Sequence, residues 1–154
     1  MDVQELLDRE AIRCTLTKYT FATDRGRVED LLACFTADGV LDFEGEWRGC
    51  GQHEVRARIV AAAELTARSS PGRTLLRHHL STQHVELVSR VEARAWSYFM
   101  AVTDAGPDHV GRYVDRLRHV AGSWLIAHRR VSVEWWSPGT IYVEQAARAR
   151  ERCR

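Results

Sequence analysis

The spacing of hydrophobic and polar positions changes near the middle of the chain, from helical in the first half to alternating in the second. Residues 2–24 predict a long helix, with Asp2 as N-cap and Glu5 three residues later in capping-box position. The other elements of this half are shorter: a helix at 28–35, a strand with a turn at 39–47 and an alanine-rich helix at 53–68.

Four long strand-like runs make up most of the second half, at 75–88, 91–104, 109–121 and 123–136. Their short connections favour an antiparallel meander. Helices followed by such a sheet predict an α+β fold, in which a curved antiparallel sheet wraps on the N-terminal helices into a cone with an interior pocket. We expect the cone domain to span 1–137 and a basic helical tail to span 138–154.

Composition makes the chain an ordinary soluble globular protein and excludes several classes of partner. It has 154 residues, of which 45% are hydrophobic and 28% charged, and a formal net charge of +1. No bulk field therefore attracts it to nucleic acid or to a membrane. The start "MDVQELLDRE" does not resemble a signal peptide, and the cysteines form no C-x-x-C pair. We expect a cytoplasmic protein with reduced thiols at Cys14, Cys34, Cys50 and Cys153.

Several catalytic signatures are absent from the sequence. There is no glycine-rich phosphate loop and no G-x-S-x-G elbow. Cys50 and His53 form a C-x-x-H, but no second pair completes a zinc site. We therefore expect no bound metal.

The segment "LRHHLSTQHVEL", residues 76–87, places two histidines side by side. Neighbouring residues of a strand point to opposite faces, so His78 and His79 cannot both face the interior. The apolar residues near the end of this strand favour the face of His79. A β-bulge would invert this parity at the start of the strand, so the pattern leaves both histidines as candidates.

Two aspartates occupy positions that call for a partner. Asp115 shares a strand face with Tyr113 and Leu117, opposite a row of arginines, so it points inward. It either pairs with an arginine and braces the sheet, or lines the pocket and orients a catalytic group. Asp24 lies in the last turn of the first helix, where the helix dipole disfavours a negative charge. It is either solvated and paired with a nearby arginine, or placed there for chemistry.

The strand at 91–104 carries large side chains on both faces. Trp96, Tyr98 and Met100 share one face, and Phe99 lies on the other. Both faces are expected to be covered, one by helices or the pocket and one by another surface. A homodimer through the outer sheet face is the oligomer that this pattern favours.

The chain resembles the SnoaL-like group of the nuclear transport factor 2-like superfamily over roughly residues 4–137. The resemblance rests on "KYTFATDRGRVEDLLACFTADGVLDF", "LRHHLSTQHVEL" and "GRYVDRLRHVAGSWLIAHRRV". It is strongest to the cofactor-independent dehydratases, scytalone dehydratase and bile-acid 7α-dehydratase. The superfamily also includes isomerases, cyclases, epoxide hydrolases and proteins that only bind, so the fold alone does not define the activity.

The resemblance implies an Asp–His dyad as the catalytic core. His78 matches the catalytic histidine, Asp24 the helix aspartate and Tyr19 a tyrosine of the same helix. The residues that would line the substrate pocket depart from the family pattern. Phe43 stands where the related enzyme has a tyrosine, and Met100 stands where another has a carboxylate.

The function that follows is a dehydratase, or a related isomerase, that needs no cofactor. The apolar walls favour a hydrophobic cyclic substrate of polyketide, steroid or terpenoid type. We expect the substrate-binding residues to be Phe43, Trp96, Tyr98, Met100, Tyr113 and Asp115. The alternatives are a small-molecule binding protein without chemistry and a structural β subunit of a ring-hydroxylating dioxygenase.

Overall fold

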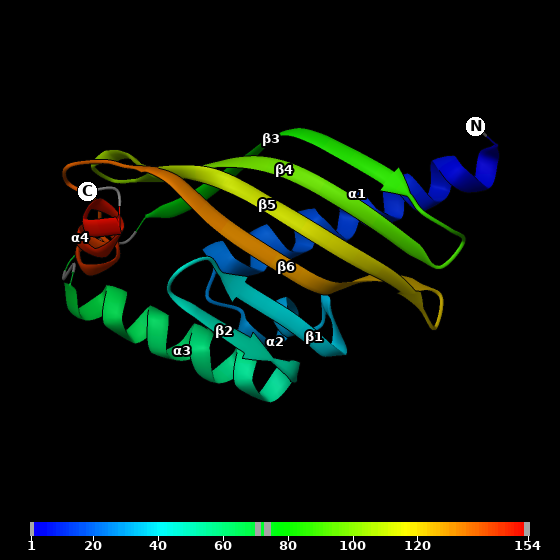
Figure 1. Cartoon of the computed structure of the whole chain (residues 1–154), viewed down its shortest axis with the longest axis horizontal. Coiled ribbons are helices and arrows are strands. Elements are labelled where there is room, and N and C mark those ends of the chain that lie inside the picture. Colours follow the sequence, from blue (N-terminus) through cyan, green and yellow to red (C-terminus); the bar gives the residue numbers. More distant parts are fainter. Residues whose placement is uncertain (1, 70–71, 73–74, 153–154) are drawn as a thin grey trace.

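The computed structural model describes residues 2–69, 72 and 75–152 (Figure 1). Its helices are α1 (Val3–Asp24), α2 (Val28–Leu32), α3 (Gly51–Ser69) and α4 (Val143–Arg152). Its strands are β1 (Phe35–Phe43), β2 (Trp47–Cys50), β3 (Leu76–Leu87), β4 (Glu92–Thr103), β5 (Gly106–Val120) and β6 (Ser123–Trp136). Cys153 lies outside the described residues.

The first helix begins as its sequence predicts. The Asp2 side chain accepts a hydrogen bond from the Glu5 backbone, and the Glu5 side chain accepts one from the Asp2 backbone, which completes the capping box. Ile12, Leu16 and Tyr19 are buried at helical spacing and anchor α1 to the sheet. α1 therefore ends at a fixed position inside the fold.

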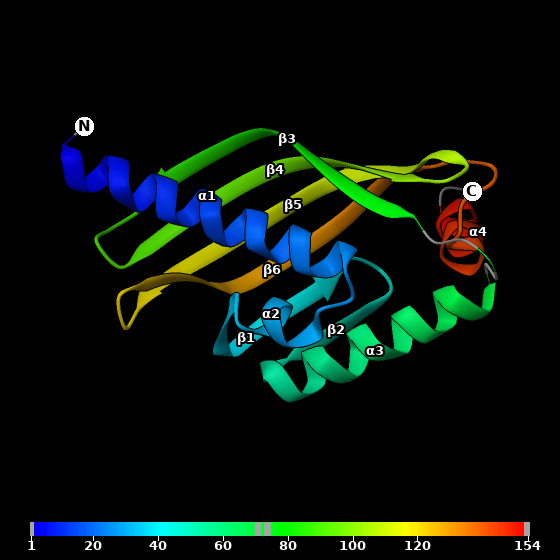
Figure 2. The same ribbon diagram turned by 180° about the vertical axis from the view of Figure 1, so that it is seen from behind.

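The strands form one curved, unclosed sheet in the order β2-β1-β6-β5-β4-β3. Figures 1 and 2 show α1 crossing one face of this sheet, with α2 and α3 near β1 and β2. The expected antiparallel meander is present in β3 to β6. β1 pairs with β6, the last strand of the meander, and runs parallel to it. The helix predicted at 28–35 ends at Leu32 in the structure, because Phe35 is already part of β1 and pairs with β6.

Two of the interruptions of the strand register determine which side chains of β3 and β5 face inward near the candidate site. The first is in β3, where Ser81 pairs with Tyr98 and Gln83 with Ser97, so that Thr82 is an extra residue. The second is in β5, between the partners of Ala101 and Val102, and makes Asp108 an extra residue. Each such bulge changes which side chains face inward on either side of it.

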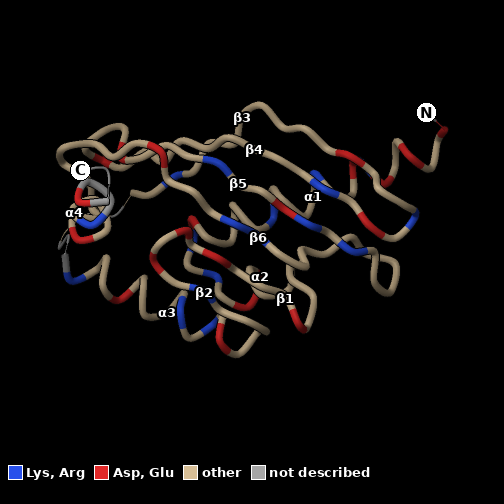
Figure 3. The backbone as a smooth tube through the Cα atoms, in the orientation of Figure 1, with Lys and Arg blue, Asp and Glu red and all other residues tan. Residues whose placement is uncertain are grey.

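Charged residues of both signs are spread over the helices and strands (Figure 3). In the part of the chain that the structure describes, no helix combines the length and apolar character that crossing a membrane requires.

Candidate active site

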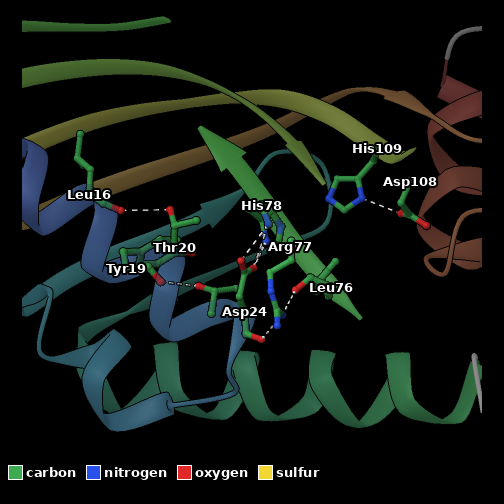
Figure 4. Close-up of polar contacts among 10 residues, drawn as sticks. Leu16, Tyr19, Thr20, Asp24, Leu76, Arg77, His78, Asp108 and His109 are labelled. Atoms are coloured by element: carbon green, nitrogen blue, oxygen red, sulfur yellow. Dashed lines mark hydrogen bonds and ion pairs between the residues drawn. The ribbon is translucent and has the colours of Figure 1, made fainter. Parts of the chain in front are cut away.

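Asp24 and His78 meet where the end of α1 approaches the start of β3 (Figure 4). His78 Nδ1 lies 2.7 Å from Asp24 Oδ1, and only 8% and 7% of the two side chains are exposed. The His78 backbone N–H also donates to both carboxylate oxygens, at 3.1 and 3.0 Å. Because β3 is an edge strand, Asp24 satisfies a backbone donor that no neighbouring strand can reach. The carboxylate thus fixes both the strand and the imidazole ring.

The bulge at Thr82 decides which histidine faces inward. Before it, the even positions face the interior, so His78 is inward and His79 is exposed. After it, the odd positions do so, and Val85 is buried in the core. Thr82 has a φ of 44°, in the left-handed region that is unfavourable for a β-branched residue. The apolar pattern around Val85 therefore predicts the inner face of β3 correctly only for the residues after the bulge.

Tyr19 lies one turn before Thr23 on the buried stripe of α1. It is 4% exposed, and its ring contacts the Arg129 guanidinium, whose central carbon lies 4.0 Å from the ring centroid. Burial raises the pKa of Tyr19 above its ordinary value, although the nearby Arg129 opposes the change. The phenol is therefore protonated at neutral pH and available as a hydrogen-bond donor.

Asp115 is clamped by Arg129. The Nε and Nη2 atoms of Arg129 donate to the two carboxylate oxygens of Asp115, each at 2.8 Å, and both side chains are fully buried. The guanidinium also lies over Tyr113, 4.3 Å from its ring centroid. Burial opposes a charged guanidinium, but Asp115 more than compensates and raises the pKa of Arg129. Asp115 thus has the position expected of a brace within the sheet.

The aromatic residues of β4 that we expected to line the pocket lie on the outer face of the sheet. Tyr98 and Met100 are 54% and 39% exposed, and Trp96 shares their outer face. Their predicted place inside the cone is therefore wrong, because small residues occupy the inner face of β4 and leave room for the core. Phe99, which the sequence pattern placed on the opposite face, points inward and stacks on Tyr113 at 4.6 Å between ring centroids.

Phe43 keeps its expected inner position. It is partly buried against the core and stacks on Trp47, with ring centroids 4.9 Å apart. Two hollows of about 440 and 250 Å³ both have Lys18 and Cys34 in their linings. Neither includes His78, whose inner neighbours are Phe99 and His109. The predicted interior pocket stays a prediction.

His109 and Asp108 are the site residues that sequence reasoning missed. His109 Nδ1 lies 2.7 Å from Asp108 Oδ2, and the His109 ring centroid lies 5.8 Å from that of His78 (Figure 4). A regular strand would point these two neighbours to opposite faces, and only the bulge in β5 buries both. Among the described residues, no three histidine, cysteine or acidic side chains gather in a way that could hold a metal ion.

Many solved structures share this fold. A candidate scytalone dehydratase from Novosphingobium aromaticivorans superposes with a TM-score of 0.75 at 21% identity, covering 89% of this chain and 91% of the other. The hexachlorocyclohexane dehydrochlorinase LinA-type3 from Novosphingobium barchaimii gives 0.75 at 15% identity, covering 90% and 94%. The β subunit of a candidate aromatic-ring-hydroxylating dioxygenase from Novosphingobium aromaticivorans gives 0.69 at 16%, covering 90% and 96%.

These superpositions establish the fold. A search of curated protein sequences finds no match. The SnoaL-like domain family matches residues 4–130, which is most of the chain. The chain therefore belongs to the SnoaL-like domain family.

Proposed function

We propose that the protein is a cofactor-independent lyase of dehydratase type, in which Asp24 and His78 act on a hydrophobic cyclic compound. The observation that carries the proposal is the buried 2.7 Å contact between Asp24 Oδ1 and His78 Nδ1. A carboxylate on Nδ1 fixes one tautomer and leaves Nε2 as the basic nitrogen. Similar folds include a dehydrochlorinase and a candidate dehydratase, both named for eliminations.

The chemistry needs a base, a stabilised enolate and a proton for the leaving group. His78 Nε2 removes the proton next to a carbonyl, and the C–H electron pair becomes an enolate. Tyr19, kept protonated by burial, donates a hydrogen bond to the enolate oxygen. The enolate collapses to a C=C bond, the C–O bond breaks, and the hydroxyl takes a proton and leaves as water. A related isomerase returns the proton to another carbon instead.

The test is elimination from cyclic β-hydroxy ketones of one, two and four rings, followed by the absorbance of the enone product. His78→Asn and Asp24→Asn should each lower turnover by about 10²-fold or more. His79→Asn is the matched control, because this neighbouring histidine lies on the outer face, and it should leave turnover unchanged. Full activity in both site variants would refute the assignment.

A structural subunit is the second candidate, and the packed interior favours it. Phe99 contacts His78 and stacks on Tyr113 inside the fold, and a dioxygenase β subunit has the same fold. This alternative predicts that the chain co-purifies with a larger oxygenase chain. A binder without chemistry predicts stabilisation by the same ketones with no product formed.

A further inference from the structure

The second buried carboxylate–imidazole pair is as well built as the first. Asp108 and His109 are 2% and 5% exposed. The Asp108 carboxylate accepts from Thr140 Oγ1 at 2.7 Å and from the Ile141 backbone N–H at 2.8 Å, besides its contact with His109 Nδ1. Burial alone would raise the pKa of Asp108, but His109 and these donors together lower it. Asp108 is therefore a fixed, ionised acceptor that holds the His109 ring.

The two pairs form one row, Asp24–His78–His109–Asp108. Figure 4 shows the imidazole of His109 between Asp108 on one side and His78 on the other. The two rings meet nearly edge to face, at 75° and 5.8 Å between centroids, and Phe99 contacts both. Each carboxylate occupies an Nδ1 atom. The Nε2 atoms are thus the nitrogens that remain for chemistry.

The groups that face His109 are few. Trp136 and Tyr142 cover its ring, each with centroids 5.1 Å away, and burial chiefly raises the pKa of Tyr142 to about 12, which keeps that phenol uncharged. The Trp136 indole N–H is buried without an acceptor among the described residues, which leaves a donor for an incoming oxygen atom. Asp108 and His78 are therefore the neighbouring groups whose charges affect the charge state of His109.

Two imidazoles this close cannot easily both be charged. Burial lowers the pKa of His109, a positive charge on His78 lowers it further, and Asp108 acts in the opposite direction. At neutral pH His109 therefore rests uncharged.

We propose that His109 is a second catalytic residue, the acid that protonates the leaving hydroxyl after His78 has taken the proton from carbon. This role rests on the proposed function. The proton passes from His78 to His109, directly or through one water molecule, and then to the departing oxygen as the C–O bond breaks. Water and the unsaturated ketone are the products, and both histidines return to their neutral forms.

The test compares two leaving groups on one ring. Hydroxide needs a proton to depart, whereas chloride does not, so a cyclic β-hydroxy ketone and its β-chloro analogue separate the acid from the base. His109→Phe keeps the aromatic packing and His109→Gln keeps a donor for Asp108. Each should lower dehydration by about 10²-fold or more and leave dehydrochlorination, after subtraction of the buffer rate, within a few-fold of wild type. His78→Asn should lower both.

His128→Gln is the matched control. His128 also lies beside a carboxylate, with Nε2 3.8 Å from Asp42 Oδ2, but on the opposite sheet face from its neighbour Arg129. It should change neither rate. Equal loss of both reactions in the His109 variants would reduce His109 to a packing role and overturn the proposal, as would full dehydration activity. A wild-type chain that eliminates neither compound would instead overturn the proposed function, and this role with it.

A second measurement needs no substrate. Imidazole NMR titration should show the apparent pKa of His109 rising in His78→Asn, because a positive charge on His78 lowers it. A His109 titration that does not respond to His78→Asn would also overturn the proposal, because proton transfer from His78 requires that His109 respond to the state of its neighbour.

Discussion

At the scale of single residues, the most constrained group is Arg129, a fully buried guanidinium held by one carboxylate and two aromatic rings. Its Nη1 atom is buried without a hydrogen-bond partner among the described residues. Removing Asp115 would therefore leave an uncompensated charge in the core, which costs far more than the loss of one contact. Arg129 is also a residue whose importance the sequence did not indicate, because it stands directly beside Arg130, an ordinary half-exposed arginine.

We expect Asp115→Asn to lower the free energy of unfolding by about 3–5 kcal/mol, measured by urea denaturation. Replacing both partners, as in Asp115→Leu with Arg129→Met, should recover most of that loss, since neither charge then remains buried. Glu134→Gln breaks the half-exposed ion pair with Arg112 and should cost less than about 1 kcal/mol. Equal effects of Asp115→Asn and Glu134→Gln would contradict this account.

His109 gives stability a pH dependence whose sign is fixed by its burial. Its pKa is lowered from 6.5 in the folded state, so the unfolded chain binds a proton more readily. The stabilisation is complete above about pH 6.5 and is lost as the pH falls through the lower folded pKa. We expect Tm to drop between about pH 7.5 and 5.5, and to drop less in His109→Phe. His79→Gln, an exposed control, should behave like wild type.

At the scale of elements, the periodicities predicted α1 and the four meander strands, because burying one face selects a repeat of 3.6 or of two residues. They could not locate the bulges, since one extra residue leaves composition unchanged while reversing every side chain on one side of it. His78 and His79 stayed open for that reason, although the family resemblance pointed to His78. Asp108 was missed for the same reason.

Deleting Thr82 tests the bulge in β3. Without it a single register must hold, so His78 and Val85 cannot both face inward. We expect NMR to show the loss of the contact between Asp24 and His78, or the deletion to lower the unfolding midpoint because Val85 leaves the core. Thr82→Gly is the control: glycine accepts a φ of 44° without strain, so it should keep the contact and change stability by no more than about 1 kcal/mol. A deletion variant with both features intact would refute the role of the bulge.

At the scale of the whole molecule, the order of helices and strands predicted the α+β cone, but two long-range features had no local signal. One is the parallel pairing of β1 with β6, which depends on where the chain returns. The other is the connection after β6, where Thr140 and Ile141 bind Asp108. The predicted division at residue 137 remains a prediction, yet residues beyond it hold part of the candidate site.

The outer sheet face is the remaining feature of this scale, and we propose that it joins two copies of the chain. Tyr98 and Trp135 are 54% and 46% exposed beside Met100, and a symmetric dimer would bury the same patch twice. Tyr98→Glu with Trp135→Glu should therefore convert a dimer to a monomer in sedimentation equilibrium, because each charge would be desolvated in the interface. Phe21→Glu, on an equally exposed aromatic of α1, is the matched control and should leave the dimer intact. A wild-type chain that sediments as a monomer would refute the proposed dimer.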